Sequence, residues 1–394
     1  MLICAGFIPA QPPTVKTAAL NLRDYGWQTP DPIHPHETDT VERRSIVIDH
    51  LGRVLVGFAV RERSGLVTHE QPALAFHVVR LSPDGKADLS LSLPANGWRD
   101  NSIYLSDTDQ IIVRANDRIQ FLQVDPGNTE KESWNTLVSC SFRCKVKQSP
   151  TGRTLFLYTA DADPPLTIIH TSQSPTLKRC GKAPQSIESF EDKIQNYPQS
   201  ITDEFAYFSG QTRRLDLFTY RWPLCDYEHR VEMPLHIRGR FTVLNDQSFV
   251  ANADFVANAL TKPDSDALRT LVVISSDGHV KFRQPMAKHE SWDNFWAPIR
   301  SSERGDRIAV DMLTTRGGNR TLDISSHVTS RRIAVYDIEA GKELASIPVN
   351  PKHRYRFEFD LSPDGHRLAI LEDDTVKVVD LEWAAKREKT ADPE

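Results

Sequence analysis

A short turn phrase that recurs along the chain constrains its fold most. The residues LSPDG at 81–85 return at 361–365, and degraded versions stand at 148–152, 275–278 and 302–306. In such a phrase proline presets its φ angle, aspartate bonds its own backbone and glycine accepts a positive φ, so the phrase predicts a tight turn. A turn that repeats between β-like runs over the length of a chain predicts a repeat architecture.

The β-like runs group into seven units, each with two to four strand candidates. The turn after the first strand of each unit falls near Gly52, Thr108, Gly152, Thr202, Asp246, Gly305 and Gly365. This spacing is typical of a propeller blade of four antiparallel strands. The sequence therefore predicts an all-β, single-domain, seven-bladed β-propeller. The fourth unit is the least clear, and six blades result if it merges with a neighbour.

The seventh unit contains only three strand candidates, within Arg356–Leu381. A propeller that does not close its ring leaves a sheet edge exposed. We therefore expect Val15–Leu22 to supply the missing strand. The domain then spans 14–383, with a charged tail at 384–394. The proline-rich connector at 24–41 carries His34, His36, Glu37 and Asp39. These residue types can bind a metal, but in such a connector they are typical of solvated polar chain, and no cofactor or metal is expected.

Two segments resemble the repeats of bacterial WD-like and TolB-like β-propellers. Leu361–Ala369 is similar to the SPDG-x-x-(L/I)-A core of these repeats, and Arg332–Glu343 is similar to the strand-turn-strand that closes their blades. The resemblance covers about 305–381 and fades toward the middle of the chain. It implies that Asp337 holds its hairpin and that the small Ala309 and Ala369 lie where blades pack. The family includes scaffolds, ligand-binding domains and some enzymes, so the resemblance implies a fold and no single activity.

Composition excludes some classes of function. The formal net charge of −5 argues against a general nucleic-acid binder. No apolar run approaches the roughly 20 residues of a membrane-spanning helix. The apolar segment Met1–Ala10 resembles the end of a secretory signal peptide with cleavage near Ala10, although it lacks a positively charged start. We expect a periplasmic or secreted protein. The alternative is a cytoplasmic protein whose apolar tail packs on the domain.

The cysteines bear on the same question. Besides Cys4 there are four, Cys140, Cys144, Cys180 and Cys225, and an even number fits disulfides in an oxidising compartment. Free buried thiols are the alternative. Cys140 and Cys144 have a spacing that could hold a metal, but no second pair at ligand spacing exists, which argues against zinc.

No catalytic motif is present. The sequence lacks a Gly-x-Ser-x-Gly elbow, a glycine-rich phosphate loop, a His-Glu-x-x-His helix and a calcium loop. The leading hypothesis is a non-catalytic, monomeric scaffold that binds a protein partner or a small anionic ligand at the channel face. The alternative is a propeller hydrolase or lyase that draws single residues from several blades, which no spacing would reveal.

Two groups of residues are candidates for the binding surface. An arginine precedes or opens the first strand of six units: Arg44, Arg99, Arg143, Arg240, Arg300 and Arg356. Innermost strands start at one face, so these side chains would form a cationic funnel at the channel mouth. The alternative is that each pairs with a nearby acid. The second group is Trp292 and Trp296 with Arg354 and Tyr355, which could line the same mouth. The alternative for the tryptophans is burial at blade corners.

Overall fold

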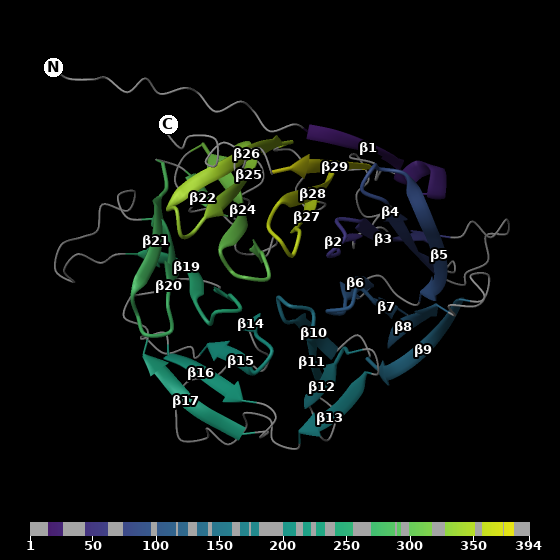
Figure 1. Ribbon diagram of the computed structural model, residues 1–394, viewed down its shortest axis with the longest axis horizontal. Coiled ribbons are helices and arrows are strands. Elements are labelled where there is room, and N and C mark those ends of the chain that lie inside the picture. The colour runs from purple at the N-terminus through teal and green to yellow at the C-terminus, as the bar shows by residue number, and fades with distance from the viewer. Residues whose placement is uncertain are drawn as a thin grey trace, which may run out of the picture.

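The fold is a ring of seven antiparallel β-sheets around a central axis (Figure 1), six of four strands and one of five. The computed structural model describes residues 15–26, 44–61, 74–95, 101–115, 117–124, 132–140, 144–159, 166–172, 175–180, 200–209, 216–221, 226–232, 241–254, 269–287, 290–292, 299–316, 328–350, 357–372 and 374–381. The seven-bladed β-propeller expected from the sequence is confirmed, and the six-bladed alternative is wrong.

Each sheet is a blade that runs outward from this axis, and we number the blades 1 to 7 from β2. The inner strands are β2 (Arg44–Ile48), β6 (Ser102–Leu105), β10 (Cys144–Gln148), β14 (Ser200–Ile201), β18 (Thr242–Val243), β23 (Arg300–Ser301) and β27 (Phe357–Leu361). The second strands are β3 (Val54–Arg61), β7 (Ile111–Ala115), β11 (Thr154–Thr159), β15 (Phe205–Ser209), β19 (Phe249–Asp254), β24 (Arg307–Thr315) and β28 (Arg367–Glu372).

The outer half of each blade follows in the same order. The third strands are β4 (Leu74–Leu81), β8 (Arg118–Val124), β12 (Leu166–His170), β16 (Asp216–Arg221), β20 (Arg269–Ile274), β25 (Val328–Asp337) and β29 (Thr375–Asp380). The outermost strands are β5 (Ala87–Ala95), β9 (Glu132–Ser139), β13 (Thr176–Cys180), β17 (Asp226–Glu232), β21 (Val280–Pro285), β26 (Lys342–Val349) and β1 (Val15–Asn21).

The N-terminal strand closes the ring, as predicted from the incomplete seventh unit. β1 pairs antiparallel with β29 and becomes the outermost strand of blade 7. The 3-10 helix η1 (Leu22–Tyr25) follows it and ends at Gly26. The Leu22 amide donates to the Asp374 carbonyl at 3.2 Å, and Arg23 Nε lies 2.6 Å from the Asp374 carboxylate. Asp374, at the tip of the β28–β29 hairpin, therefore anchors the closing segment.

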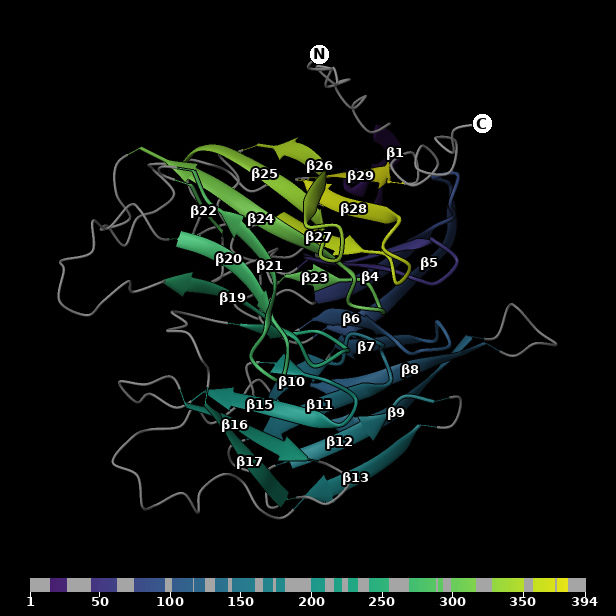
Figure 2. The same cartoon turned by 60° about the vertical axis from the view of Figure 1, so that its left-hand side comes forward.

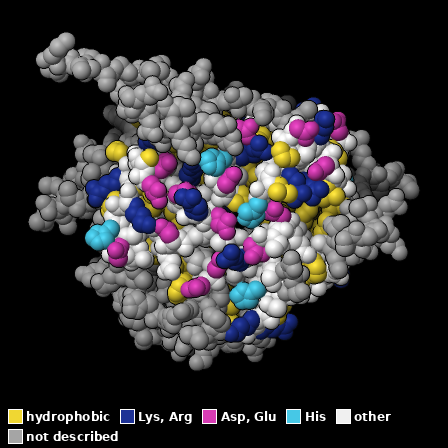
Figure 3. Space-filling model, in the orientation of Figure 1, with side chains coloured by type: hydrophobic (Ala, Val, Ile, Leu, Met, Phe, Trp, Pro, Cys, Tyr) yellow, Lys and Arg dark blue, Asp and Glu magenta, His cyan; other side chains and the backbone are white. Residues whose placement is uncertain are grey.

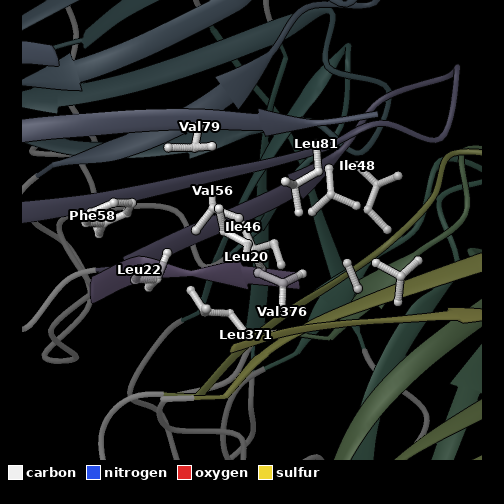
Figure 4. Close-up of a cluster of buried hydrophobic side chains, with 13 residues drawn as sticks. Leu20, Leu22, Ile46, Ile48, Val56, Phe58, Val79, Leu81, Leu371 and Val376 are labelled. Carbon is white, nitrogen blue, oxygen red and sulfur yellow. The ribbon is translucent and has the colours of Figure 1, made fainter. Parts of the chain in front are cut away.

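The hydrophobic core lies between neighbouring blades. Leu20 and Leu22 of blade 7 pack with Ile46, Val56 and other buried side chains of blade 1, and Figure 4 shows this cluster. Comparable clusters join blades 1 and 2, 2 and 3, 4 and 5, 5 and 6, and 6 and 7. Because each blade buries its apolar faces against the next, an open ring would expose one complete face of the core.

Blade 6 departs from the repeat. The inner edge of β24 pairs with two short strands, β23 and β22 (Glu290–Trp292). Figure 2 shows both beside the long β24 and β25. At the outer end of this blade, the Asp337 carboxylate accepts a hydrogen bond from the Ala340 amide at 2.8 Å. This bond confirms that Asp337 holds its hairpin, as the repeat resemblance implies.

A disulfide joins blades 2 and 3. Cys140 and Cys144 are bonded, with their Cα atoms 5.3 Å apart, and both are buried. The bond links the residue after β9 to the first residue of β10, so it closes the connection between the outer edge of one blade and the inner strand of the next. Cys180 at the end of β13 is also buried and disulfide-bonded. Cys225 lies outside the described residues.

Candidate functional site

The ring of blades has two rims with different residues. The turns after the inner strands all lie at one rim, because neighbouring strands are antiparallel, and the inner strands begin at the opposite rim. We call the first set the turn ring, and it consists of residues 49–53, 106–110, 149–153, 202–204, 244–248, 302–306 and 362–366. Of the candidate arginines, Arg44 and Arg300 begin inner strands and therefore belong to the opposite rim.

Arg300 is the arginine of that group whose side chain the structure describes. Its Nε donates to the Phe359 carbonyl at 3.1 Å and lies 3.5 Å from the Asp360 carboxylate. For Arg300 the structure therefore shows the alternative, a strand-end arginine paired with an acid of the next blade.

The other candidates are placed less fully. The backbones of Arg44 and Trp292 lie in β2 and β22. The remaining members fall outside the described part of the chain: Arg99, Arg143, Arg240, Arg356, Trp296, Arg354 and Tyr355. The cationic funnel and the aromatic surface stay predictions.

Asp360 is an acid of the innermost strands whose pKa is clearly shifted. It lies on the inner strand β27, where its carboxylate accepts a hydrogen bond from the Ile48 amide of blade 1 at 2.9 Å and its side chain is 16% exposed. Burial raises the pKa of Asp360 to about 6, against the opposing effects of Arg300 and of the backbone amides of Ile48 and Leu361. A buried carboxyl whose pKa is raised toward neutral pH is a general candidate for function.

Replacing Asp360 with asparagine should remove part of the pH dependence of stability. A pKa raised from 3.8 to about 6 means that the wild-type carboxyl stabilises the fold below pH 4 and loses this contribution as pH rises through 6. The full effect is about 3 kcal/mol at most. Asparagine still offers an oxygen to the Ile48 amide, so Asp360→Asn should gain stability over wild type between pH 4 and 8. Urea unfolding across this range measures the gain.

The control for this experiment is Asp84→Asn. Asp84 is exposed, and its hydrogen bond from Ser82 lowers its pKa, so this variant should show no gain at pH 8. Parallel pH profiles for wild type and Asp360→Asn would contradict the prediction.

The turn ring is connected from blade to blade. Arg307 Nη1 of blade 6 donates to the Gly365 carbonyl of blade 7 at 2.9 Å, and Arg367 Nη1 of blade 7 donates to the Gly52 carbonyl of blade 1 at 2.8 Å. Arg153 of blade 3 lies 3.4 Å from the Asp107 carboxylate of blade 2. These bonds fix the positions of the turns relative to one another.

Two turn glycines show how closely the blades approach at this rim. Gly365 has a φ of +72°, and a Cβ there would lie 2.7 Å from Arg307 Cδ. Gly152 has a φ of +77°, and a Cβ would lie 2.6 Å from the Leu105 carbonyl oxygen. Both the backbone conformation and the close neighbour favour glycine. At these two positions the glycine of the turn phrase therefore serves the contact between blades as well as the turn.

His50 joins three blades at the mouth. Its Nδ1 lies 2.8 Å from Asp109 Oδ1 of blade 2, and its Nε2 lies 3.4 Å from Glu303 Oε2 of blade 6. Asp109 has a φ of +60°, a left-handed conformation that aspartate tolerates better than most side chains. Burial lowers the pKa of His50, but the hydrogen bonds and charges of Asp109 and Glu303 outweigh burial, and the pKa is raised above its ordinary value.

The turn ring contains more acidic residues than arginines, several of them paired, and one exposed leucine. Its acidic residues outnumber its arginines: Asp49, Asp107, Asp109, Asp203, Glu204, Asp246, Glu303, Asp306 and Asp364 stand against Arg53, Arg153 and Arg304. Figure 3 shows acidic side chains and histidines, interspersed with Lys and Arg side chains, around the centre of the face in view. Leu51, at the tip of the blade 1 turn, is 65% exposed.

The turn that carries Leu51 is rigidly built. The Asp49 carboxylate is buried and accepts hydrogen bonds from the Leu51 amide at 3.0 Å and from the Arg53 amide at 2.8 Å. The neighbouring Gly52 carbonyl is held by Arg367, as described above. The exposed leucine therefore stands on a fixed backbone.

The chemistry of this rim is that of structural pairing. Asp49 pairs with Arg53, Asp246 with Lys281 and Asp306 with Arg304. In the part of the chain that the structure describes, no group of three or more His, Cys, Asp or Glu side chains could hold a metal ion. None of the described helices is long and apolar enough to cross a membrane.

Sequence analysis did not single out His50, Asp109 and Glu303. They stand far apart in the chain and have no common spacing. The available signal was their location, since each lies within one of the turns that the repeat had already identified.

Three solved structures are similar to this chain at 10% or 11% sequence identity. No protein-family model and no curated protein matches the chain. A structure of the β-propeller domain of Cps50 (Swd1) from Myceliophteria thermophila is 11% identical, with a TM-score of 0.43, and the match covers 78% of this chain and 92% of that one. A catalytically inactive virginiamycin B lyase from Staphylococcus aureus with quinupristin is 11% identical, with a TM-score of 0.46. The match covers 93% of this chain and 99% of that one.

A third structure, KlHsv2 with loop 6CD replaced by a Gly-Ser linker, is 10% identical with a TM-score of 0.45, and the match covers 85% of this chain and 89% of that one. At such identities the activities of these proteins are not transferred to this chain.

Proposed function

We propose that this propeller is a non-catalytic binding scaffold and that its turn ring receives a protein partner. The observation that carries the proposal is the connected turn ring, which holds Leu51 exposed among acidic side chains. A surface that is already ordered loses little conformational entropy on binding. An apolar anchor with a polar surround is the usual anatomy of a protein interface.

The charge of the turn ring favours a partner with basic residues. Asp109 and Glu303 contact His50, the residue before Leu51, so a partner segment that combines an apolar side chain with lysine or arginine is complementary to this part of the turn ring. The small anionic ligand expected from the sequence would belong to the opposite rim. Arg300 offers it limited charge, since its guanidinium already lies beside Asp360.

The enzyme alternative depends on Asp360, whose pKa of about 6 lies within the range of a general acid or base.

We also propose that the propeller spans 14–383, has SPDG-type bacterial repeats, and acts as a monomer in the periplasm or outside the cell. The Cys140–Cys144 disulfide supports an oxidising compartment.

Site-specific photocrosslinking tests the proposed surface. A photoreactive amino acid at position 51 should capture a protein from the native envelope fraction, and the same group at Leu177 should not. Leu177 is a suitable control because it is also exposed, at 41%, but lies on the outermost strand of blade 3.

The captured protein, once purified, should bind wild type about tenfold or more tightly than it binds Leu51→Asp, because a charge replaces the apolar anchor. Leu177→Asp should bind like wild type. Identical adducts from both positions, or equal affinities for both variants, would contradict a partner site on the turn ring.

A further inference from the structure

We propose that His50 is a proton-controlled latch at the turn ring. Its protonated ring bridges blade 2 and blade 6, and loss of the proton releases the Glu303 carboxylate and makes the net charge of the turn ring more negative. This inference rests on the proposed function, because it concerns the regulation of the same surface. It is independent of what the partner is.

The contacts of His50 require two donors from one ring. Nδ1 faces Asp109 at 2.8 Å and Nε2 faces Glu303 at 3.4 Å, and both partners are carboxylates, which accept hydrogen bonds. A neutral imidazole has one N–H group, whereas the protonated ring has two. In the neutral ring, one of the two carboxylates would face a nitrogen lone pair. The three-blade contact is therefore complete only when His50 carries its proton.

The two contacts of the His50 ring differ in strength, and the contact with Glu303 is the one that is lost when the ring is neutral. Asp109 Oδ1 also accepts the His50 backbone amide at 3.0 Å, so Asp109 stays bound to the blade 1 turn when the ring is neutral. Glu303 contacts His50 through Nε2, at the longer distance. The Glu303 backbone is fixed separately, because its amide donates to the Pro363 carbonyl at 2.7 Å and its carbonyl accepts from Asn245. Release therefore concerns the Glu303 carboxylate and leaves the turn in place.

The other charged groups of the surrounding turns have partners of their own. Asp49 pairs with Arg53 on the same turn, and Arg304 pairs with Asp306 in blade 6. From blade 7, Arg367 bonds Asp380 and the Gly52 carbonyl, and Asp364 accepts from Ser362. In blade 2, Asp107 faces Arg153. Asp109 and Glu303 are the charges that raise the pKa of His50 against the opposing effect of its burial.

The raised pKa of His50 determines how the bridge depends on pH. A histidine whose pKa is raised in the folded protein contributes its bridge below its ordinary pKa, and the bridge is lost as pH rises through the raised value. At lower pH the cationic ring lies between two carboxylates. At higher pH the same carboxylates face a neutral ring, so a lysine or arginine of a partner can pair with Glu303. Binding of a basic partner should therefore strengthen as pH rises.

Nuclear magnetic resonance tests the latch without a partner. The full chain is labelled in its histidine rings and leucine methyl groups, and the signals are assigned with His50→Gln and Leu51→Met. The His50 ring should titrate with a midpoint above 6.5, the ordinary value, and the Leu51 methyl groups should shift with the same midpoint. Glu303→Gln should lower the midpoint, whereas Glu204→Gln, an exposed acid in the blade 4 turn, should leave it unchanged.

Three results would overturn the latch: a wild-type midpoint at or below 6.5, equal midpoints for Glu303→Gln and Glu204→Gln, or Leu51 methyl signals that do not respond to pH. His366→Gln is the histidine control. His366 lies in the blade 7 turn with its Nδ1 3.1 Å from Arg307, so this variant should keep the His50 midpoint of wild type.

A second measurement uses the protein captured at position 51. Its affinity for wild type should increase severalfold from pH 6 to 8.5, and its affinity for His50→Gln should not. If this protein does not bind at any pH while the midpoints are as expected, the proposed function is wrong and the latch stands. If it binds with the same pH dependence to both forms, the proposed function stands and the latch does not regulate it.

Discussion

A chain that begins at residue 27 is expected to lose the stable monomeric propeller. This truncation removes β1 and η1, which pair along β29 and place Leu20 and Leu22 in the cluster between blades 7 and 1. Loss of one fully buried leucine side chain typically costs about 2–5 kcal/mol. Two leucines and a strand together approach the total stability of an ordinary domain, about 5–15 kcal/mol. Circular dichroism and size-exclusion chromatography should show unfolding or association through the exposed β29 edge.

The truncated chain also offers a rescue experiment. A synthetic peptide of residues 14–26 should restore a cooperative thermal transition, because it can add to the open edge of β29. A peptide with aspartate at positions 20 and 22 should not restore it. In the full chain, Leu22→Ala should cost about 2–5 kcal/mol, while Arg23→Ala, which removes a mostly exposed ion pair, should cost under about 1 kcal/mol. Melting of the truncated chain within a few degrees of wild type would contradict the role of β1 in closure.

The closing strand could be predicted because the local chemistry of the turns is strong. Turn residues such as Pro363 and Gly365 impose their conformation without help from the rest of the fold. Once the turns were located, the seventh unit was short by one strand, and the need to cover its edge pointed to the N-terminus. Fold class, number of blades and closure all follow from such local signals combined with one geometric requirement.

The inner strand β14 was located only by the turn expected near Thr202, because it consists of two residues and two residues show no alternation. Its position depends on the neighbouring blade, where the Ser200 hydroxyl accepts the Val243 amide at 2.9 Å. The second inner strand of blade 6, β22, was missed for the same reason. Short inner strands are held by contacts with other blades, and those contacts leave no pattern in the local sequence.

The contacts of His50 at the turn ring could not be predicted either, because they also join different blades. His50, Asp109 and Glu303 meet because three turns of different blades converge on one mouth, and the sequence specifies only that each turn exists. The candidate arginines had a visible pattern, but Arg300 shows that such a pattern can arise from pairs between blades, here with Asp360.

Besides the truncation at residue 27, the substitution Arg331→Met has a large expected effect on stability. Arg331 in β25 and Asp311 in β24 form an ion pair inside blade 6, with Nε 3.0 and 3.1 Å from the two carboxylate oxygens. Their side chains are 7% and 0% exposed. By the alternation of the strands they lie on the face that carries Ala309 and Ile333 toward blade 7. Loss of one partner of a buried pair weakens the compensation of the other charge and typically costs about 3–5 kcal/mol.

The control and the double variant separate this cost from a general loss of an arginine. Arg80→Met removes a similar cross-strand pair with Asp88, but that pair is partly exposed, so the variant should cost under about 1 kcal/mol. Adding Asp311→Leu to Arg331→Met should recover most of the lost stability, because well-packed apolar side chains replace a buried pair at little cost. Urea unfolding measures all three variants. If Arg331→Met costs no more than Arg80→Met, or if the double variant is no more stable than Arg331→Met, then the pair is not a desolvated charge pair in solution.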